Sequence, residues 1–306
     1  MLGKFNEVVV NNQVFHSFPA PAKLNLFLHI VGQLDNGYHQ LETVFQFLDH
    51  SDTLHIRATN NNKDTDKNKS AITLLTPIPG VNNSDNLIVK AALLLQEHTQ
   101  CQQGAEIKLD KILPMGGGLG GGSSNAATVL LALNAIWNTQ LSIEELAKLG
   151  VKLGADVPIF VHGYAAFAQG IGEQLTPASP KIYWYLVSKP DCSISTQSVF
   201  TAEDLTRDTA TIRYSDADIE NYHNDCQTWV IKHYPEVAKL LGWLIEYAPS
   251  QMTGTGACIF SRFDSEKEAL NVQSQLPHGI ESFVAKGLNQ SPVHSAIAAI
   301  EKIKLG

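Results

Sequence analysis

A glycine-rich segment near the middle of the chain carries the strongest chemical signal in the sequence. Six of the seven residues from Gly116 to Gly122 are glycine, and Ser123 and Ser124 then open an apolar, helix-like segment that ends near Trp137. Glycine loses more backbone entropy on folding than any other residue, so such a run is costly unless the backbone must wrap closely around something. The free N–H groups at a helix N-terminus attract anions. The segment therefore predicts a phosphate cradle rather than a mere tight turn.

The surroundings of this loop argue against three common nucleotide-binding motifs. A Walker A loop needs Lys followed by Ser or Thr at the helix start, and no lysine stands there. The formal G-x-G-x-x-G from Gly116 to Gly121 follows a segment that alternates Lys108, Asp110 and Lys111, whereas a dinucleotide fold needs a buried parallel strand at that point. A protein-kinase glycine loop leads into a strand and is followed by HRD and DFG motifs, which this chain lacks.

Three polar residues outside the loop could do chemistry, although each has a plain structural alternative. Asp156, in the stretch GADVPIF, is either a helix cap or a functional carboxylate. Lys23 stands two residues after Pro21 at the head of a predicted strand, where a solvated edge charge is the simpler interpretation. Asn25 follows two positions later, so on a strand it points to the same face as Lys23.

Two turns could border a binding site. Tyr38 and His39 follow Asn36 and Gly37, a strong turn signal, and are either ordinary surface residues or recognition groups. A second glycine turn runs from Thr253 to Ala257 and leads into a predicted strand. It is either a strained turn or an element that closes a cleft against the first loop.

Length and composition limit the class of protein. The chain has 306 residues, which predicts about two domains, and its 44% hydrophobic content suffices for a real core. The formal charge of −8 argues against a non-specific nucleic-acid binder, which needs a basic surface. The four cysteines lie far apart without a CxxC pair, so the sequence shows neither a short-spaced zinc ribbon nor a disulfide scaffold. We expect no metal site formed by the protein alone.

No segment of the sequence has the character of a membrane span or a secretory signal. No stretch approaches the ~20 apolar residues that cross a bilayer, and the N-terminus lacks a basic flank with a sustained apolar core. We therefore expect a soluble cytoplasmic protein. The composition of the polar stretch 60–70 predicts a hairpin tip or loop.

The elements that must position these residues follow an α+β pattern. In the first half, strands are expected at 24–32, 52–59, 71–77 and 105–114, with 52–59 and 71–77 as an antiparallel pair, and helices after Asp85, after Gly122 and after Ser142, whose capping box is completed by Glu145. In the second half, strands are expected at 164–169, 182–187, 256–263 and 282–288, and helices near 196–204, 225–247, 265–275 and 291–303. We place a boundary near residue 165, giving domains 1–165 and 166–306.

Four separated motifs, in order, resemble one kinase superfamily. Pro114 to Ala127 resembles the second motif of the superfamily of galactokinase, homoserine kinase, mevalonate kinase and phosphomevalonate kinase (GHMP kinases). The stretches 21–46, 153–163 and 252–260 are similar to the other motifs of one of its families, the 4-diphosphocytidyl-2-C-methyl-D-erythritol kinases. The two additional glycines in GLGGGSS also point to that branch.

The resemblance implies a fold and a reaction. The expected fold is a two-domain GHMP kinase fold, with an N-terminal domain like the second domain of ribosomal protein S5 and a C-terminal ferredoxin-like α/β sandwich. The expected reaction is ATP-dependent phosphorylation of the 2-hydroxyl of 4-diphosphocytidyl-2-C-methyl-D-erythritol, with Mg²⁺ accompanying the nucleotide. The partner is thus a small molecule, without nucleic acid or membrane, and the chain is expected to be a monomer or weak homodimer.

The resemblance also assigns roles to residues. It implies that Asp156 is the catalytic base and that Lys23 is its partner. For ATP it implies Pro114, Met115, Gly116, Gly117, Gly118, Leu119, Gly120, Gly121, Gly122, Ser123 and Ser124 around the phosphates, with Asn86 and Lys111 toward the adenine end; Asn86 could equally cap its helix, and Lys111 could be a solvated strand residue.

For the acceptor the resemblance implies Asn25, Tyr38, His39, Asn125, Thr196 and Phe200, with cytosine held between Tyr38 and Phe200. Phe200 could instead be a core residue of its helix. Many members carry Asp where this chain has Asn125, and an amide cannot serve as a base.

Three other functions compete with this one. Another small-molecule kinase of the superfamily, for homoserine or mevalonate, is disfavoured by Tyr38, His39 and the additional glycines. A nucleotide-binding module without catalysis is disfavoured because Lys23 and Asp156 are both present. An NAD-binding oxidoreductase is disfavoured by the context of the glycine loop.

Overall fold

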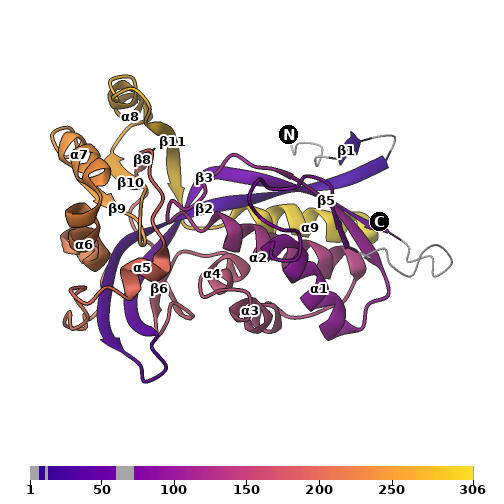
Figure 1. The fold of residues 1–306 in the computed structure, drawn as a ribbon. Coiled ribbons are helices and arrows are strands. Elements are labelled where there is room, and N and C mark those ends of the chain that lie inside the picture. Colours follow the sequence, from indigo (N-terminus) through magenta and orange to yellow (C-terminus); the bar gives the residue numbers. More distant parts are fainter. Residues whose placement is uncertain (1–6, 11–12, 60–71, 306) are drawn as a thin grey trace.

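A long β-hairpin runs through the whole molecule. The computed structural model describes residues 7–10, 13–59 and 72–305. Its two longest strands, β2 (Gln13–Gln33) and β3 (His39–Thr59), have 21 residues each and pair antiparallel (Figure 1). Residues in the middle of both strands are buried in succession rather than alternately, because elements pack on both faces of the hairpin.

The hairpin is the centre of a mixed sheet. The main strand order is β1-β2-β3-β11-β8-β10-β9, and β5 and β6 pair with further stretches of β3. One edge of β3 is thus shared by three strands: β5 along 53–59, β11 at 47–48 and β6 along 43–45. The other strands are β1 (Glu7–Val10), β4 (Ile72–Leu74), β5 (Gly104–Asp110), β6 (Ala166–Gln169), β7 (Gln174–Pro177), β8 (Trp184–Lys189), β9 (Ser250–Met252), β10 (Ile259–Phe263) and β11 (Glu281–Leu288).

The helices form two groups that cover different parts of the sheet (Figure 1). The first group lies against β2 and β3 and consists of α1 (Leu87–Thr99), α2 (Gly121–Trp137), α3 (Ile143–Val151), α4 (Val157–His162) and α9 (Pro292–Leu305). The second group covers β8 to β11 and consists of α6 (Asp225–His233), α7 (Pro235–Leu244) and α8 (Glu266–Gln273). The short helix α5 (Thr196–Phe200) and a 3₁₀ turn, Asp216–Asn221, lie in the connection between β8 and α6.

Each group of helices encloses a hydrophobic core. The first core joins α1, α2 and α4 to the hairpin through fully buried residues such as Phe47, Leu130 and Ile159. The second core joins α6 and α7 to β8 and β10 through residues such as Leu186, Val237 and Ile259. Burial of such side chains contributes about 1.5–3 kcal/mol each. The two cores hold the two ends of one hairpin.

The predicted division at residue 165 stays a proposal. The elements that follow residue 165 do not form one separate group, because some of them pack with elements that precede it. Strand β6 pairs with β3, and α9 packs against α2 and β2, with Val293 and Ile297 in the first core. The end of the chain thus returns to the first group of helices. None of the helices among the described residues is long and apolar enough to cross a membrane.

Three expectations about elements were wrong in detail. Strand β4 pairs parallel with β5 and not antiparallel with 52–59. The reason is that β2 and β5 already occupy both edges of that part of β3. The helix expected at 225–247 is two helices, because Pro235 begins α7 and cannot continue α6. The helix near 196–204 ends at Phe200. The polar stretch 60–70 lies outside the described residues.

The capping box at Ser142 is confirmed, and it gives a stability prediction. The Ser142 hydroxyl accepts from Glu145 N–H at 3.2 Å, and the Glu145 carboxylate accepts from Ser142 N–H at 2.8 Å. We expect Ser142→Ala to lower the free energy of unfolding by about 1 kcal/mol. Urea denaturation measures this change. Ser274→Ala, which removes an exposed hydroxyl bonded to a C-terminal helix carbonyl, is the control; equal losses in both variants would contradict the capping role.

Candidate active site

The glycine loop ends at the first turn of α2. Gly120 is the N-cap residue, with φ +70°, and the first intrahelical bond runs from Ser124 N–H to Gly120 O at 2.8 Å. The amides of residues 121–123 therefore have no acceptor within the helix. Together with the positive end of the helix dipole, these free amides suit an anion. Phosphate binding at this loop stays a prediction.

The second glycine turn packs directly on this loop. Cys258 N–H donates to Gly117 O at 3.2 Å, and Asn25 N–H donates to the Thr253 hydroxyl at 2.9 Å. The two backbones are so close that a Cβ on Gly118 would lie 2.3 Å from Thr253 O. Gly118 also has φ +75°. The structure confirms that the second turn closes against the first loop.

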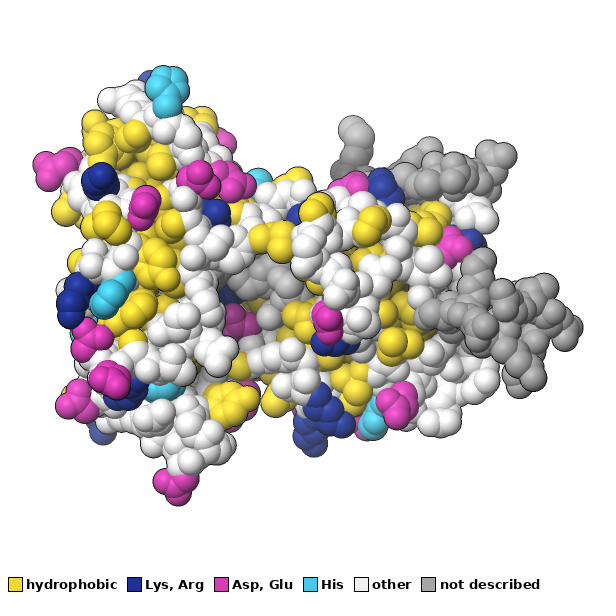
Figure 2. All heavy atoms as spheres, viewed as in Figure 1, with side chains coloured by type: hydrophobic (Ala, Val, Ile, Leu, Met, Phe, Trp, Pro, Cys, Tyr) yellow, Lys and Arg dark blue, Asp and Glu magenta, His cyan; other side chains and the backbone are white. Residues whose placement is uncertain are grey.

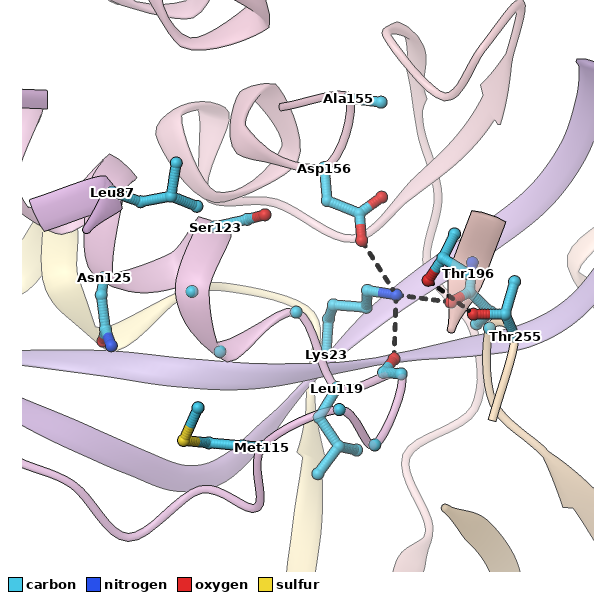
Figure 3. Close-up of a pocket in the computed structure, with 18 of the residues that line it drawn as sticks. Lys23, Leu87, Met115, Leu119, Ser123, Asn125, Ala155, Asp156, Thr196 and Thr255 are labelled. Atoms are coloured by element: carbon cyan, nitrogen blue, oxygen red, sulfur yellow. Dashed lines mark hydrogen bonds and ion pairs between the residues drawn. The ribbon is translucent and has the colours of Figure 1, made fainter. Parts of the chain in front are cut away.

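The ammonium group of Lys23 lies at the meeting point of the loop, β2 and the α3–α4 turn (Figure 3). Lys23 Nζ is 2.6 Å from Asn25 Oδ1, 3.1 Å from Gly118 O and 3.2 Å from Asp156 Oδ2. An ammonium group has three donors, and these three oxygens can accept all of them. Lys23 is buried in the middle of β2, so it is not the solvated edge charge that its sequence position suggests.

Asp156 occupies the N-cap position of α4 but does not act as a cap. Its side chain makes no hydrogen bond to the helix amides. Instead it extends toward Lys23, and it keeps 35% of its side-chain surface exposed. The geometry therefore favours a functional carboxylate that one cation orients and that a ligand can still reach.

A cavity of about 580 Å³ opens beside this ion pair. Figure 2 shows the corresponding hollow in the surface, between the part that carries α5 to α8 and the part that carries α1 to α4. Most of the predicted site residues line it: Lys23, Asn25, Asn86, Lys111, every residue from Pro114 to Ser123, Asn125, Asp156, Thr196 and Phe200. The fold thus brings together residues from five separate stretches of sequence.

Asn86 and Lys111 lie at one end of the cavity. Asn86 caps α1, since its Oδ1 accepts from Ile88 N–H at 2.9 Å, while its buried Nδ2 has no hydrogen-bond partner among the described residues. The capping role is therefore confirmed, and Asn86 also leaves a donor at the cavity; its contact with ATP stays a prediction. Lys111 Nζ binds Asp52 Oδ2 at 2.8 Å, so Lys111 is not simply a solvated strand residue.

Asp52 is a residue of this region that the sequence did not reveal. Its carboxylate is completely buried and accepts from Ile112 N–H and Leu113 N–H at 2.8 Å each. It also accepts from Asn125 Nδ2 at 3.1 Å. Asp52 therefore ties the residues before the glycine loop to the first turns of α2. The only sequence signal was an acidic residue inside a predicted strand.

Thr196 and Phe200 lie at the opposite end of the cavity, on α5. The Thr196 hydroxyl is 3.0 Å from that of Thr255 in the second glycine turn (Figure 3). The His39 ring stacks on Phe200, with centroids 4.9 Å apart and an interplanar angle of 24°. Burial, and then the neighbouring Arg207, lower the pKa of His39, so this imidazole is neutral at pH 7.

Three of the predicted residues do not line the cavity. Ser124 is buried in the first turn of α2, so only its neighbour Ser123 presents a hydroxyl there. His39 stacks on Phe200 but is not itself among the lining residues. Tyr38 is 57% exposed on the turn between β2 and β3. Their roles stay predictions. Sequence reasoning also missed Thr43, whose hydroxyl binds Asn25 Nδ2 at 3.0 Å from the neighbouring strand.

Comparison with known proteins assigns the family. The family model of the GHMP kinase N-terminal domain matches residues 86–164, and that of the C-terminal domain matches residues 217–280. The 4-diphosphocytidyl-2-C-methyl-D-erythritol kinase of Colwellia psychrerythraea is 60% identical over 288 residues, which cover 92% of this chain and 93% of the relative. The chain belongs to the 4-diphosphocytidyl-2-C-methyl-D-erythritol kinase family. It is therefore a small-molecule kinase with the GHMP kinase fold.

Other members and solved structures agree with this assignment. The family member of Pseudoalteromonas atlantica is 55% identical over 95% of this chain and 99% of its own length. A crystal structure of a 4-(cytidine 5'-diphospho)-2C-methyl-D-erythritol kinase is 27% identical, with a TM-score of 0.76 over 89% of this chain and 98% of that one. The mevalonate kinase of Methanococcus jannaschii is 15% identical with a TM-score of 0.63, and it shares the fold.

The contact between the two glycine turns can be tested with a matched pair of alanine variants. Gly116 and Gly118 both have positive φ, but a Cβ on Gly116 meets nothing within 4 Å. We expect Gly116→Ala to lose about 1–2 kcal/mol of stability from backbone conformation alone. Gly118→Ala has to separate two backbones in addition, so it should lose clearly more stability and most kinase activity. Thermal unfolding and turnover measure both, and similar losses in the two variants would contradict the close packing.

Proposed function

We propose that this family member transfers the γ-phosphate of ATP to the 2-hydroxyl of 4-diphosphocytidyl-2-C-methyl-D-erythritol. The products are ADP and the 2-phosphate, in the non-mevalonate route to isoprenoid precursors. The observation that carries the proposal is the contact between Lys23 Nζ and Asp156 Oδ2, 3.2 Å apart, beside a glycine loop suited to phosphate. Phosphoryl transfer to a hydroxyl needs a proton acceptor and a positive charge at the phosphate, and this pair supplies both.

Asp156 takes the proton of the attacking hydroxyl in this proposal. Its Oδ2 faces Lys23, while the partly exposed carboxylate offers Oδ1 to the acceptor. As the acceptor oxygen bonds to phosphorus, the bond from the γ-phosphorus to the bridging oxygen breaks and ADP leaves. A general base of this kind contributes typically 10²–10⁴-fold to the rate.

Lys23 orients the base and stabilises charge. Because its ammonium group is bonded to Asn25, Gly118 and Asp156, it occupies one fixed position beside the phosphate loop. A positive charge there orients the Asp156 carboxylate and attracts the negative charge of the transferring phosphoryl group. Gly120 allows this approach, since a Cβ at that position would lie 3.1 Å from Lys23 Cε.

Backbone amides supply most of the proposed contacts with the nucleotide phosphates. The loop from Met115 to Ser123 and the first amides of α2 face the cavity, and they suit the α-, β- and γ-phosphates. Mg²⁺ accompanies the nucleotide in this proposal. The described residues contain no group of three or more His, Cys, Asp or Glu side chains that could hold a metal ion. Mg²⁺ commonly relies on phosphate and water ligands with one or two carboxylates, and Asp156 is a carboxylate that lines the cavity beside the loop.

In this proposal, the acceptor end of the cavity binds the cytidine group. Phe200 and Thr196 line the cavity, and Tyr38 stands exposed on the hairpin turn, where its ring can stack on a pyrimidine. Asn25 lies beside Lys23 and suits the diol of the acceptor. We also propose a cytoplasmic location, where ATP is available, and a monomer or weak homodimer.

Replacing the proposed base tests the mechanism. We expect Asp156→Asn to lower kcat by about 10²–10⁴-fold because the amide cannot accept the hydroxyl proton, while ATP still binds. A coupled ADP assay and a nucleotide-binding titration measure the two effects. Asp264→Asn removes a carboxylate that is 81% exposed, far from the cavity, and should behave like the wild type. Near wild-type kcat in Asp156→Asn would rule out the base assignment.

Replacing the proposed stacking residue tests acceptor recognition. Tyr38→Ala should raise the KM for the cytidine acceptor by about tenfold, since base–aromatic stacking is worth about 1–3 kcal/mol, and should leave the KM for ATP unchanged. Tyr247→Ala is the control. Tyr247 is similarly exposed, but it follows α7 and its ring contacts that of Trp243. An equal rise in both KM values would count against stacking, and turnover of homoserine or mevalonate instead would count against the acceptor itself.

A further inference from the structure

Arg207 makes an unusual set of contacts behind the acceptor end of the cavity. Its Nε donates to His39 Nε2 at 3.0 Å, and its Nη2 donates to the carbonyl oxygens of Phe200, at 3.1 Å, and Ala202. Its Nη1 donates to Leu205 O at 3.1 Å. One guanidinium group thus joins the first residue of β3 to the C-terminal end of α5.

The contact with His39 fixes the state of the imidazole. An arginine side chain has donors and no acceptor, so His39 Nε2 must be the unprotonated nitrogen. The neutral ring then carries its hydrogen on Nδ1. Burial and the charge of Arg207 lower the pKa of His39, and the uncharged Phe200 covers one face of the ring. Arg207 therefore selects one tautomer of a neutral histidine.

The same side chain fixes the position of Phe200. The Phe200 ring lines the cavity and stacks on His39, and the Phe200 carbonyl binds the guanidinium group. A cation at the carbonyl end of a helix is also electrostatically favourable. The relative position of the two rings, which come from β3 and α5, therefore depends on Arg207.

Arg207 is itself held in place from both sides. Leu205 is buried in the second core. Thr209 N–H donates to Ile30 O of β2 at 3.1 Å, and the Thr209 hydroxyl donates to the buried Asp225 Oδ2 at 2.8 Å. The segment that carries Arg207 is thus attached to β2 and α6. This rigidity is what a residue needs in order to position others.

We propose that Arg207 is a positioning residue for pyrimidine recognition, which holds His39 as the Nδ1–H tautomer and Phe200 in parallel contact with it. This inference rests on the proposed function and deepens it. The N3 atom of cytosine is an acceptor that a ring N–H donor can satisfy, whereas N3 of uracil carries a hydrogen; O2 is an acceptor in both bases and does not distinguish them. A fixed Nδ1–H donor therefore favours a cytidine diphosphate alcohol over its uridine counterpart.

Kinetics of two Arg207 variants test the proposal. Arg207→Gln should raise the KM for the cytidine acceptor by about tenfold, the equivalent of one hydrogen bond to a charged group, with kcat and the KM for ATP little changed. Arg207→Lys keeps the charge without the planar fork, so it should recover only part of the loss. Arg57→Gln is the control, because Arg57 pairs with Glu106 at the far end of β3. Wild-type acceptor KM in either Arg207 variant would overturn the proposal.

The tautomer of His39 gives a second readout that a general loss of structure would not produce. Long-range ¹H–¹⁵N spectra of the ligand-free wild-type protein, assigned by comparison with His39→Asn, should show hydrogen on Nδ1 and none on Nε2. In Arg207→Gln, hydrogen should appear on Nε2. A wild-type His39 that carries its hydrogen on Nε2 would overturn the proposal, whatever the kinetics.

A Phe200 variant separates failure of this inference from failure of the proposed function. If Phe200→Ala leaves the acceptor KM unchanged, the pyrimidine does not bind at this end, and the proposed acceptor site fails together with the inference. If Phe200→Ala raises that KM but Arg207→Gln does not, the acceptor site stands and only the role of Arg207 is wrong.

Discussion

The ammonium group of Lys23 is the point at which the separate parts of this molecule meet. It is buried in β2, the strand that both groups of helices share, and its three hydrogen-bond acceptors come from β2 itself, the glycine loop and the α3–α4 turn. A buried cation is stable only when its donors are satisfied. The requirement to satisfy Lys23 therefore fixes where the loop and Asp156 lie relative to each other, and so fixes the geometry at which phosphate and hydroxyl can meet.

Two buried carboxylates support this arrangement from outside the cavity. Asp52 holds the residues that enter the glycine loop, together with Lys111 and Asn125. Asp225 holds β2 and the segment that carries Arg207, since it accepts from Ile30 N–H and from the Thr209 hydroxyl. Neither contacts the proposed reacting atoms. Each lies where irregular backbone must be fixed, because a loop has few hydrogen bonds of its own to define its shape.

The long hairpin connects the two ends of the cavity, which the proposed function assigns to two different ligands. Its middle carries Lys23 and Asn25, while its turn carries Tyr38 and leads into His39. The first group of helices supplies the phosphate loop and Asn86 on one side, and α5 supplies Thr196 and Phe200 on the other. A rigid pair of strands thus sets the distance between the nucleotide end and the acceptor end, and contact between the two glycine turns closes the space between them.

The sequence alone predicted a glycine loop that opens a helix, the capped helices, most strands and, through motif resemblance, the family and many of the residues that line the cavity. These features depend on local patterns: glycine runs, capping residues and hydrophobic periodicity act over a few positions. Only the tertiary structure showed that Lys23 is buried, that Asp156 does not cap its helix, that β5 separates β4 from β3, that Asp52 binds Lys111 and Asn125, and that Arg207 binds His39. Those facts depend on contacts between distant stretches of chain, and the burial and pairing of a charged side chain are decided by its neighbours in space, which no local pattern of residues records.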